Sequence, residues 1–384
     1  MELRQNIIPA CIPIKQKRRL RMEKLKPLEK RSLTFVTTNN CNAACEHCLM
    51  CCKPGGKQSL TFEQMKKVID EADQAYDLLQ AVFTGGEPTL LGKDLLLTIA
   101  YCSSKGIMTR MVTNAMWADT PEHAEDCIKL FRAAGLCEIN FSYDDYHAAF
   151  IPEQNIINAW KASKNKGFAG VLIANAQSAT PTIDAAYIKK MLDEDVLTWD
   201  MDQRYERKER GHRFSEDGTE YIITESRLQC TGRAEERLGA EHYLDFCTDE
   251  ELQTATCNGV VTRATVSFDN HLWACCGVQS SGNSILDLGD LNAESITDVA
   301  ERAADSIILN AIHEVGPYRM MMYAKYKDPS IVWKEKYFSM CEMCNDMTTN
   351  PKAVKVLKEN VRDLFNMISY MRKLNREAAE AEAQ

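Results

Sequence analysis

The chain has 384 residues, which corresponds to roughly two or three domains of ordinary size. Hydrophobic residues make up 45% and charged residues 26% of the chain, the composition of a globular protein that can bury a core. The formal net charge of −9, from 46 basic and 55 acidic residues, argues against general nucleic-acid binding. No apolar run approaches the length of about 18 residues that a membrane helix needs, so no membrane span is expected.

Residues 1–30 form a basic N-terminal segment. Nine Lys or Arg and two acidic residues lie between Lys15 and Arg31, without an apolar core of signal-peptide length. We interpret the segment as a solvated entry to the fold, with a site for an acidic partner as the alternative. A cytoplasmic, reducing location is expected, where clustered cysteines indicate metal binding rather than disulfides.

Five of the sixteen cysteines lie within the stretch CNAACEHCLMCC, residues 41–52. Cys41, Cys45 and Cys48 have the spacing C-x-x-x-C-x-x-C, which lets one short loop surround a single metal centre. A structural zinc site takes four ligands, and the two remaining cysteines of the stretch can supply the fourth. A 4Fe–4S cluster also takes four thiolates, but with only three its fourth iron stays open to another ligand. The triplet alone is compatible with both centres.

The segments that follow alternate between strand and helix patterns. The β-branched run 32–38 predicts a strand that ends at the cysteines, and the apolar spacing in 61–76 predicts a helix. A second strand ends in GGEP, residues 85–88. The further predicted elements are a helix 94–104, a strand 107–113, a helix 121–134, a strand 137–143, a helix 153–166, a strand 170–175 and a helix 184–193. This alternation predicts an α/β fold with parallel strands and ligands at their C-terminal ends.

The cysteine triplet after a first strand, followed by GGEP after a second, resembles the radical S-adenosylmethionine (radical SAM) superfamily over residues 30–235. The resemblance implies a partial (β/α)6 TIM-like barrel with a 4Fe–4S cluster on Cys41, Cys45 and Cys48. It also implies that the open iron binds S-adenosylmethionine and that an electron from the cluster cleaves this cofactor. The resulting 5′-deoxyadenosyl radical then removes a hydrogen atom from the substrate.

Other positions match the cofactor contacts of that family. The residues that match the contact to the methionine amino group are Gly85, Gly86, Glu87 and Pro88. His47 stands where the family usually has an aromatic residue, and its ring would cover the adenine. The residues expected near the ribose, the methionine carboxylate or the adenine are Thr113, Asn114, Ser142, Asp144, Gly232 and Arg233. The alternative is that the strand-end side chains only cap the helices that follow.

The sequence SYDDYH, residues 142–147, lies just beyond the predicted fourth strand. Tyr143, Asp145 and His147 are candidate proton donors, with hydrogen bonds at a helix entry as the alternative. The charged and aromatic segment 195–224 then interrupts the alternation of elements. We expect it to be a loop over the active site or a solvated insertion.

The second half of the chain carries another group of cysteines. A hairpin with an Asp-Asn-His turn is predicted at VSFDNHLWACCG, residues 266–277, and the pair in CEMC can chelate one metal. The candidate ligands are Cys257, Cys275, Cys276, Cys341 and Cys344. Residues 245–348 resemble the SPASM and twitch extensions of radical SAM enzymes, which implies one auxiliary 4Fe–4S cluster. A structural zinc site is the alternative, because four thiolates suit zinc equally well.

The remaining cysteines and the C-terminal tail complete the predicted organisation. Single cysteines expected to be buried as small apolar residues are Cys11, Cys102, Cys127 and Cys137, whereas Cys230 and Cys247 have no assigned role. An apolar stripe predicts one helix over 351–384, docked on the barrel. The expected domains are the basic segment 1–30, the barrel 31–240, the cysteine-rich extension 245–348 and the helix 351–384.

These features together predict a radical SAM enzyme, because a zinc-binding cysteine-rich module leaves GGEP and the barrel pattern without a role. Family members with such an extension mostly modify peptides or proteins by crosslinking, epimerisation or oxidation. A peptide or protein substrate is therefore expected, with a small metabolite or nucleotide as the alternative. The stretch before Ser32 is too short for a peptide-recognition domain, so recognition is expected from another protein or from the barrel. The expected electron donor is a protein such as flavodoxin or ferredoxin.

Overall fold

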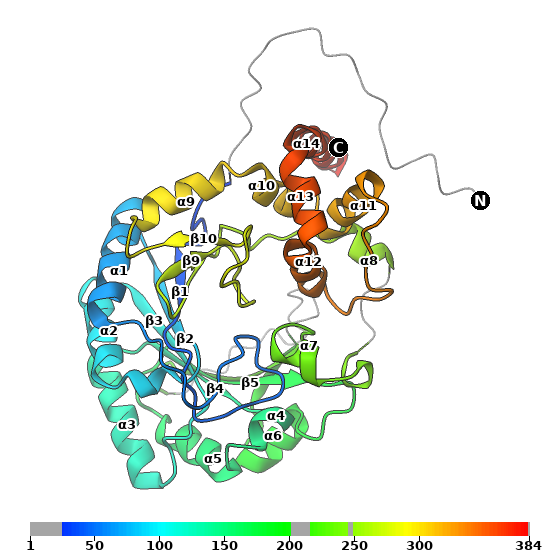
Figure 1. The fold of residues 1–384 in the computed structure, drawn as a ribbon. Helices are drawn as coiled ribbons and strands as arrows, with labels where there is room; N and C mark the ends of the chain where they lie inside the picture. Colours follow the sequence, from blue (N-terminus) through cyan, green and yellow to red (C-terminus); the bar gives the residue numbers. More distant parts are fainter. Residues whose placement is uncertain (1–24, 201–215, 245–248, 383–384) are drawn as a thin grey trace.

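The computed structural model describes residues 25–200, 216–244 and 249–382. Its strands are β1 (Ser32–Val36), β2 (Gln80–Thr84), β3 (Met108–Thr113), β4 (Glu138–Ser142), β5 (Gly170–Gln177), β6 (Leu197–Asp200), β7 (Glu220–Arg227), β8 (Thr265–Val266), β9 (His271–Trp273) and β10 (Asp287–Asp290). They form a ten-stranded sheet in the order β10-β9-β8-β1-β2-β3-β4-β5-β7-β6. Eight adjacent strands of this sheet, in the order β8-β1-β2-β3-β4-β5-β7-β6, run parallel to one another. Figure 1 shows the sheet curving around a central space, with the first helices outside it. The predicted α/β partial barrel is confirmed.

Helices of the barrel part lie between successive strands, with two of them after β2 and two after β4. They are α1 (Phe62–Tyr76), the short 3-10 helix η1 (Pro88–Leu91), α2 (Lys93–Ser104), α3 (Pro121–Ala134), α4 (Asp145–Ala148), α5 (Glu153–Ala162), α6 (Ala185–Leu192) and α7 (Arg233–Arg237). Local sequence explains where they begin. Thr61 caps α1 by accepting a hydrogen bond from the Gln64 amide, and the Gln64 side chain returns the contact to the Thr61 amide. The apolar stripe of α1 then packs on the sheet, so its pattern was sufficient to predict it.

The segment 195–224 differs from the prediction of a loop or insertion. Its two described ends are strands, because residues 197–200 form β6 and Glu220 begins β7. Strand β7 pairs with β5 along its whole length, and β6 lies outside β7 at the edge of the sheet. β7 therefore lies next to β5, where β6 would lie if the strands followed chain order. The order of β6 and β7 in the sheet is thus the reverse of their order in the chain. Residues 201–215, which connect them, lie outside the described residues.

The C-terminal part joins the barrel through a hairpin. Strand β8 pairs in parallel with β1, and β9 pairs antiparallel with β8, as the predicted hairpin requires. The turn residue Asn270 has a φ of 62°, a conformation that asparagine tolerates well. The other elements of this part are η2 (Ala240–His242), α8 (Asp249–Thr254), α9 (Ile296–Ala304), α10 (Ile307–Glu314), α11 (Pro317–Lys327) and α12 (Met340–Thr349). They enclose a second hydrophobic cluster, separate from the main cluster around the barrel sheet.

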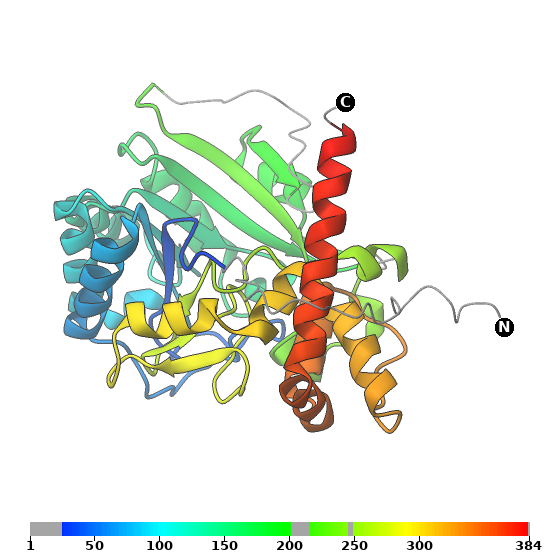
Figure 2. The same ribbon diagram turned by 90° about the horizontal axis from the view of Figure 1, so that it is seen from above.

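The C-terminal tail is two helices rather than the one predicted. Helix α13 (Pro351–Glu359) ends at Asn360, where the backbone leaves helical geometry (φ −119°, ψ 35°), and α14 (Val361–Glu382) begins directly after it. Leu364 and Ile368 of α14 are buried, but Leu374 is 38% exposed, so the predicted stripe ends early. Among the described residues, helix α14 packs against α10, and its buried side chains belong to the hydrophobic cluster of the C-terminal part rather than to that of the barrel (Figure 2).

Two further sequence predictions concern the ends of the chain and the membrane. Most of the basic segment 1–30 and the residues Cys11 and Cys247 lie outside the described residues. Within the described ranges, the helices lack the length and apolar character that crossing a bilayer requires.

Candidate functional site

Strand β1 leads directly into the loop that carries the cysteine triplet. We call residues 41–52 the cysteine loop. It closes on itself through backbone contacts: the Cys48 amide donates to the Cys45 carbonyl at 3.2 Å, and the Cys41 amide donates to the Lys53 carbonyl at 3.2 Å. Figure 1 shows the chain after β1 extending into the space between β4 and α7. After burial and the Asp144 charge, the charges of Cys48 and Cys41 also raise the pKa of Cys45, so the three thiols of this loop are neighbours.

The chemistry of these thiols fits a positively charged metal centre. Burial raises the pKa of Cys41 to about 11 and that of Cys45 to about 12, so both resist ionisation on their own. A hydrogen bond from the Cys52 thiol lowers the pKa of Cys48 to about 5. A bound metal supplies the positive charge that partly buried thiolates need. Three such thiols in one loop meet the requirement for a cluster with one open iron.

The GGEP segment binds, through its backbone, the residues just before the cysteine loop. The Gly86 amide donates to the Thr38 carbonyl at 2.7 Å, and the Glu87 amide donates to the Asn40 carbonyl at 2.9 Å. A Cβ added to Gly86 would lie 1.9 Å from the Asn40 carbonyl oxygen, which explains the glycine at this position. The ends of β1 and β2 are thus locked together just before Cys41.

The Glu87 carboxylate is engaged inside the protein. It is fully buried and accepts hydrogen bonds from the Thr113 hydroxyl at 2.8 Å, the Asn114 amide at 2.9 Å and the Thr89 hydroxyl at 2.6 Å. Burial raises the pKa of Glu87, and these donors act against that rise. Glu87 therefore ties the end of β2 to the end of β3, and its contact to a cofactor amino group stays a prediction.

The end of β3 also reaches the cysteine loop through a side chain. Asn114 donates from Nδ2 to the Asn42 side-chain oxygen at 2.7 Å, and the same nitrogen lies 3.7 Å from the Cys41 sulfur. The Trp117 ring nitrogen donates to the Thr113 hydroxyl at 3.0 Å. These contacts place Asn114 beside the triplet, as its position at a strand end suggested.

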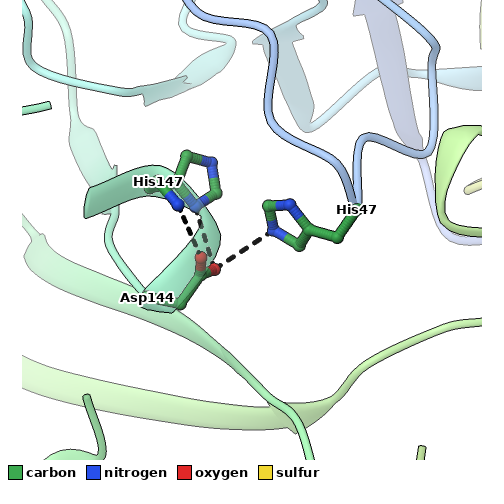
Figure 3. Close-up of side chains that lie close together, drawn as sticks. All are labelled: His47, Asp144 and His147. Atoms are coloured by element: carbon green, nitrogen blue, oxygen red, sulfur yellow. Dashed lines mark hydrogen bonds and ion pairs between the residues drawn. The ribbon is translucent and has the colours of Figure 1, made fainter. Parts of the chain in front are cut away.

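Asp144 lies between two histidines at the end of β4 (Figure 3). One carboxylate oxygen is 3.2 Å from His47 Nε2 and 2.9 Å from His147 Nδ1, and the other accepts the Tyr146 and His147 backbone amides. Burial alone would raise the pKa of Asp144, but the two histidines outweigh it and hold the pKa well below its usual value. One ligand atom from each of the three side chains lies within 4.8 Å of the others. His47 also stacks on Tyr146, with ring centroids 4.8 Å apart.

The candidate proton donors after Ser142, the last residue of β4, have different surroundings. Asp145 accepts the backbone amides of Thr182 and Ile183, each at 2.9 Å, and so orders the segment before α6. Tyr143 is only 2% exposed, and burial raises the pKa of its hydroxyl. His147 faces Asp144. Their catalytic roles stay predictions.

Arg233 holds the cysteine loop from the opposite side. Its guanidinium donates to the Cys45 carbonyl at 2.7 Å and to the Cys52 carbonyl at 2.6 Å, and its amide donates to the Cys48 carbonyl at 3.1 Å. Gly232 has a φ of 64°, and a Cβ there would lie 2.5 Å from the Leu49 carbonyl oxygen. The predicted barrel-closing segment therefore supports the loop directly. Its predicted contact to the adenine is not tested by these hydrogen bonds.

The second group of cysteines also comes together. We call Cys257, Cys275, Cys276, Cys341 and Cys344 the second cysteine site. Burial, followed by the charges of Cys257, Cys275 and Cys341, raises the pKa of Cys344, so these sulfurs are neighbours. A Cβ built on Gly259 would lie 3.2 Å from the Cys276 sulfur and 4.0 Å from the Cys257 sulfur. The hairpin, the segment before it and α12 each contribute to the group.

The remaining described cysteines are not among the predicted metal ligands. Cys102 is buried as predicted, whereas Cys127 and Cys137 are only half-buried. Cys230 is 6% exposed, and burial raises its pKa to about 11. Cys51 is half-buried, and burial raises its pKa.

Comparison with known proteins identifies the family. A family model described as the Radical SAM superfamily matches residues 35–172. Over 338 residues the chain is 18% identical to a Bacillus subtilis (strain 168) protein named "Putative peptide biosynthesis protein YydG", covering 88% of this chain and 98% of that protein.

Two solved structures are similar to the chain at low identity. One, described as native anSMEcpe with bound AdoMet and Cp18Cys peptide, has 11% identity and a TM-score of 0.48, covering 88% of this chain and 99% of that chain. The other, BtrN in complex with AdoMet and 2-DOIA, has 11% identity and a TM-score of 0.43, covering 78% and 91%.

A parallel strand–helix barrel with a three-cysteine loop after its first strand defines a radical SAM domain. The chain contains a radical SAM domain, since residues 35–172 match that family model. It is therefore an enzyme, and its cofactors are S-adenosylmethionine and a 4Fe–4S cluster.

Sequence reasoning missed how the site is braced. His47 and Asp144 are 97 residues apart in the chain, and Arg233 is even farther from its partner Cys45. Spacing rules report only on local geometry, so neither contact had a signal in one sequence. The position of each residue at a strand end was the only usable indication.

Proposed function

We propose that this enzyme modifies a peptide or protein by radical chemistry that starts at the cysteine loop. The observation that carries the proposal is the bracing of that loop by the GGEP turn, Asn114 and Arg233, which holds three thiols at the strand ends. A peptide substrate is supported by the similarity to a protein whose name includes peptide biosynthesis. The matched region includes 98% of that protein.

Each residue around the loop has a proposed role toward the cofactors. Cys41, Cys45 and Cys48 hold the 4Fe–4S cluster, which when bound supplies the electron that cleaves S-adenosylmethionine. His47 covers the adenine, and Asp144 fixes the orientation of the His47 ring through their 3.2 Å contact. Asn114 lies beside Cys41, where it can orient a polar group of the cofactor.

Among the candidate proton donors, His147 is the one that we favour. Both oxygens of Asp145 already receive backbone amides, and Tyr143 is buried with a raised pKa. His147 faces the same carboxylate as His47 and therefore lies beside the proposed cofactor position. Its role would be to donate or accept a proton at the substrate.

The second cysteine site is proposed to hold one auxiliary 4Fe–4S cluster. Cys257, Cys341, Cys344 and one of the adjacent Cys275 and Cys276 provide four thiolates, which close the coordination. A closed cluster suits electron transfer, so its proposed role is to take up the electron left on the substrate after hydrogen abstraction. Flavodoxin or ferredoxin is the proposed electron donor to the barrel cluster.

The first test addresses the chemistry of the cysteine loop. The anaerobically reconstituted, reduced protein should convert S-adenosylmethionine to 5′-deoxyadenosine. Replacing Cys41, Cys45 and Cys48 together with Ala should abolish this conversion, whereas Cys51→Ala should leave it nearly unchanged. Cleavage that persists in the triple variant, or loss of the cluster in Cys51→Ala, would show that the ligands are assigned wrongly.

The second test addresses the substrate. Short open reading frames next to the gene should be co-expressed with the enzyme, and the peptides should be analysed by mass spectrometry. A mass change that requires intact Cys41, Cys45 and Cys48 is expected in one of these peptides. If no peptide changes and 5′-deoxyadenosine formation is instead stimulated by a small metabolite or nucleotide, the peptide proposal is wrong.

A further inference from the structure

A polar bridge connects the barrel helix α7 with α12, the helix that carries Cys341 and Cys344. The Lys334 ammonium contacts a Glu235 oxygen at 2.6 Å and a Glu342 oxygen at 3.0 Å. Asn345 donates to the other Glu235 oxygen at 3.4 Å. Glu235 belongs to α7, whereas Glu342 and Asn345 belong to α12. We call Glu235, Lys334, Glu342 and Asn345 the α7–α12 bridge.

One carboxylate of the α7–α12 bridge is buried and the other is half-buried. The Glu342 side chain is 2% exposed, so its charge depends on the partners that it has inside the protein. Its second oxygen accepts the Phe338 amide at 2.7 Å, which leaves the first oxygen for Lys334. Glu235 is 30% exposed and Lys334 is 39% exposed. One lysine thus connects a buried carboxylate of α12 to a half-buried carboxylate of α7.

The opposite end of α7 holds the cysteine loop. Arg233, its first residue, donates two hydrogen bonds from its guanidinium, one to the Cys45 carbonyl and one to the Cys52 carbonyl. From Arg233 to Glu235 is only two positions of one short helix. Because Glu235 and Arg233 lie in the same five-residue helix, a displacement of α12 that moves Glu235 would also act on Arg233 and on the cysteine loop that Arg233 contacts.

The two halves of the second cysteine site are fixed by different elements. Cys275 and Cys276 follow β9 directly, and the hairpin fixes them to β1 through the sheet. Cys341 and Cys344 lie on α12, outside the sheet. Near them, Tyr243 and Phe338 stack with ring centroids 4.7 Å apart, an apolar contact beside the bridge. The bridge adds the charged contact that sets α12 against the barrel.

We infer that Lys334 is a positioning residue that fixes α12, with Cys341 and Cys344, relative to the cysteine loop through Glu235 and Arg233. The inference rests on the proposed function in one respect, namely that both cysteine sites hold clusters that serve one reaction. Its consequence is that Lys334 sets how well hydrogen abstraction at the barrel is coupled to product formation, without touching substrate or cofactor.

The test uses the full-length reconstituted enzyme and the variant Lys334→Met, which keeps the length of the side chain and removes its charge. Lys352→Met is the control, because Lys352 makes an exposed contact to Ser330 at 2.9 Å, away from the bridge. Lys334→Arg should restore much of the function, since a guanidinium can contact both carboxylates. Iron content, the ratio of 5′-deoxyadenosine to product and amide hydrogen exchange are measured for each protein.

In Lys334→Met we expect unchanged iron and faster hydrogen exchange in residues 233–237 and 340–349. The yield of product per 5′-deoxyadenosine should fall about tenfold or more, since misplacement by about 1 Å can cost roughly 100-fold in a reaction step. The Lys352→Met control should match the unaltered enzyme in all three measurements. If Lys334→Met loses all its iron, the same measurements are made on Glu235→Gln. This variant removes one charge of the α7–α12 bridge and keeps a hydrogen-bond acceptor.

Two results would overturn the inference. One is unchanged hydrogen exchange in both helices of Lys334→Met, and the other is an unchanged ratio of 5′-deoxyadenosine to product. If the unaltered enzyme holds zinc at the second cysteine site, the proposed auxiliary cluster is wrong, and the hydrogen exchange of α7 and α12 alone decides the positioning role.

Discussion

The two cysteine sites of this protein are built in opposite ways. The cysteine loop carries its three candidate ligands within eight residues of one segment, directly after β1. The second cysteine site collects its ligands from three segments between Cys257 and Cys344. The first site is therefore fixed by local geometry and by the clamps around it. The second exists only when the hairpin and α12 have docked, so its geometry depends on tertiary structure.

The surroundings of the two sites differ in the same sense. Backbone groups of the GGEP turn and the Arg233 guanidinium hold the cysteine loop from two sides. At the second site Cys276 and Cys341 are exposed and Cys344 is half-buried. A tightly braced site should tolerate few changes in its supports. The more open site should lose ligands without loss of the barrel.

The largest effect of a support residue is expected for Gly86→Ala. The new Cβ would lie 1.9 Å from the Asn40 carbonyl oxygen, so the cysteine loop or the end of β2 must shift. Such overpacking costs about 1–3 kcal/mol in the free energy of unfolding. We expect this loss in denaturant titrations of the metal-free protein, together with strongly reduced S-adenosylmethionine cleavage after reconstitution.

Gly277→Ala is the matched control at the second cysteine site. A Cβ there meets nothing within 4 Å. Stability should be unchanged or raised by about 0.4–1 kcal/mol, the usual gain when a compatible glycine becomes alanine. Equal destabilisation by the two substitutions would contradict the difference in bracing.

An effect of at most the same size is expected for Arg233→Met. The change leaves the carbonyls of Cys45 and Cys52 without this donor, which costs about 1–3 kcal/mol when such groups are buried. The reconstituted variant should lose iron to a chelator faster than the unaltered enzyme. Arg237→Met, at the exposed end of the same helix, should lose iron at the normal rate. Identical rates for the two variants would show that Arg233 does not hold the loop.

The smallest effect separates the two adjacent cysteines of the hairpin. After burial, the charges of neighbouring thiols that raise the pKa of Cys344 include that of Cys275. Cys275 is half-buried, whereas Cys276 is exposed. We therefore expect Cys275→Ala to lower the iron content of the second site more than Cys276→Ala. Iron and sulfide determination on both variants measures the difference. The reverse order would assign Cys276 as the fourth ligand.

Features that depend on local sequence were predicted correctly, and features that depend on contacts between distant segments were not. Helices α1 and α3 were predicted to within a residue, because capping residues and apolar stripes act locally. The exchange of β6 and β7 was not predicted, since strand order depends on pairing across the sheet. The break at Asn360 was also missed, because the apolar stripe continues across it at nearly helical spacing.

In the candidate site, sequence indicated which segments approach the cofactor but not what their side chains contact. Asp144 lies two residues beyond the end of β4, close to where it was expected, but its two histidine partners come from different segments. Glu87 was expected to contact an amino group of the cofactor, which stays a prediction, and its carboxylate also joins the ends of β2 and β3. Such hydrogen bonds depend on tertiary packing, so they have no pattern in a single sequence.

The most direct test of two distinct clusters in one chain is the iron content of the double variant Cys341→Ala/Cys344→Ala, measured beside its S-adenosylmethionine cleavage. We expect about half the iron of the unaltered enzyme, since one of two 4Fe–4S clusters is lost. Cleavage to 5′-deoxyadenosine should remain, and product formation should fall much further. Unchanged iron with zinc in the unaltered enzyme, or full product formation by the double variant, would contradict this expectation.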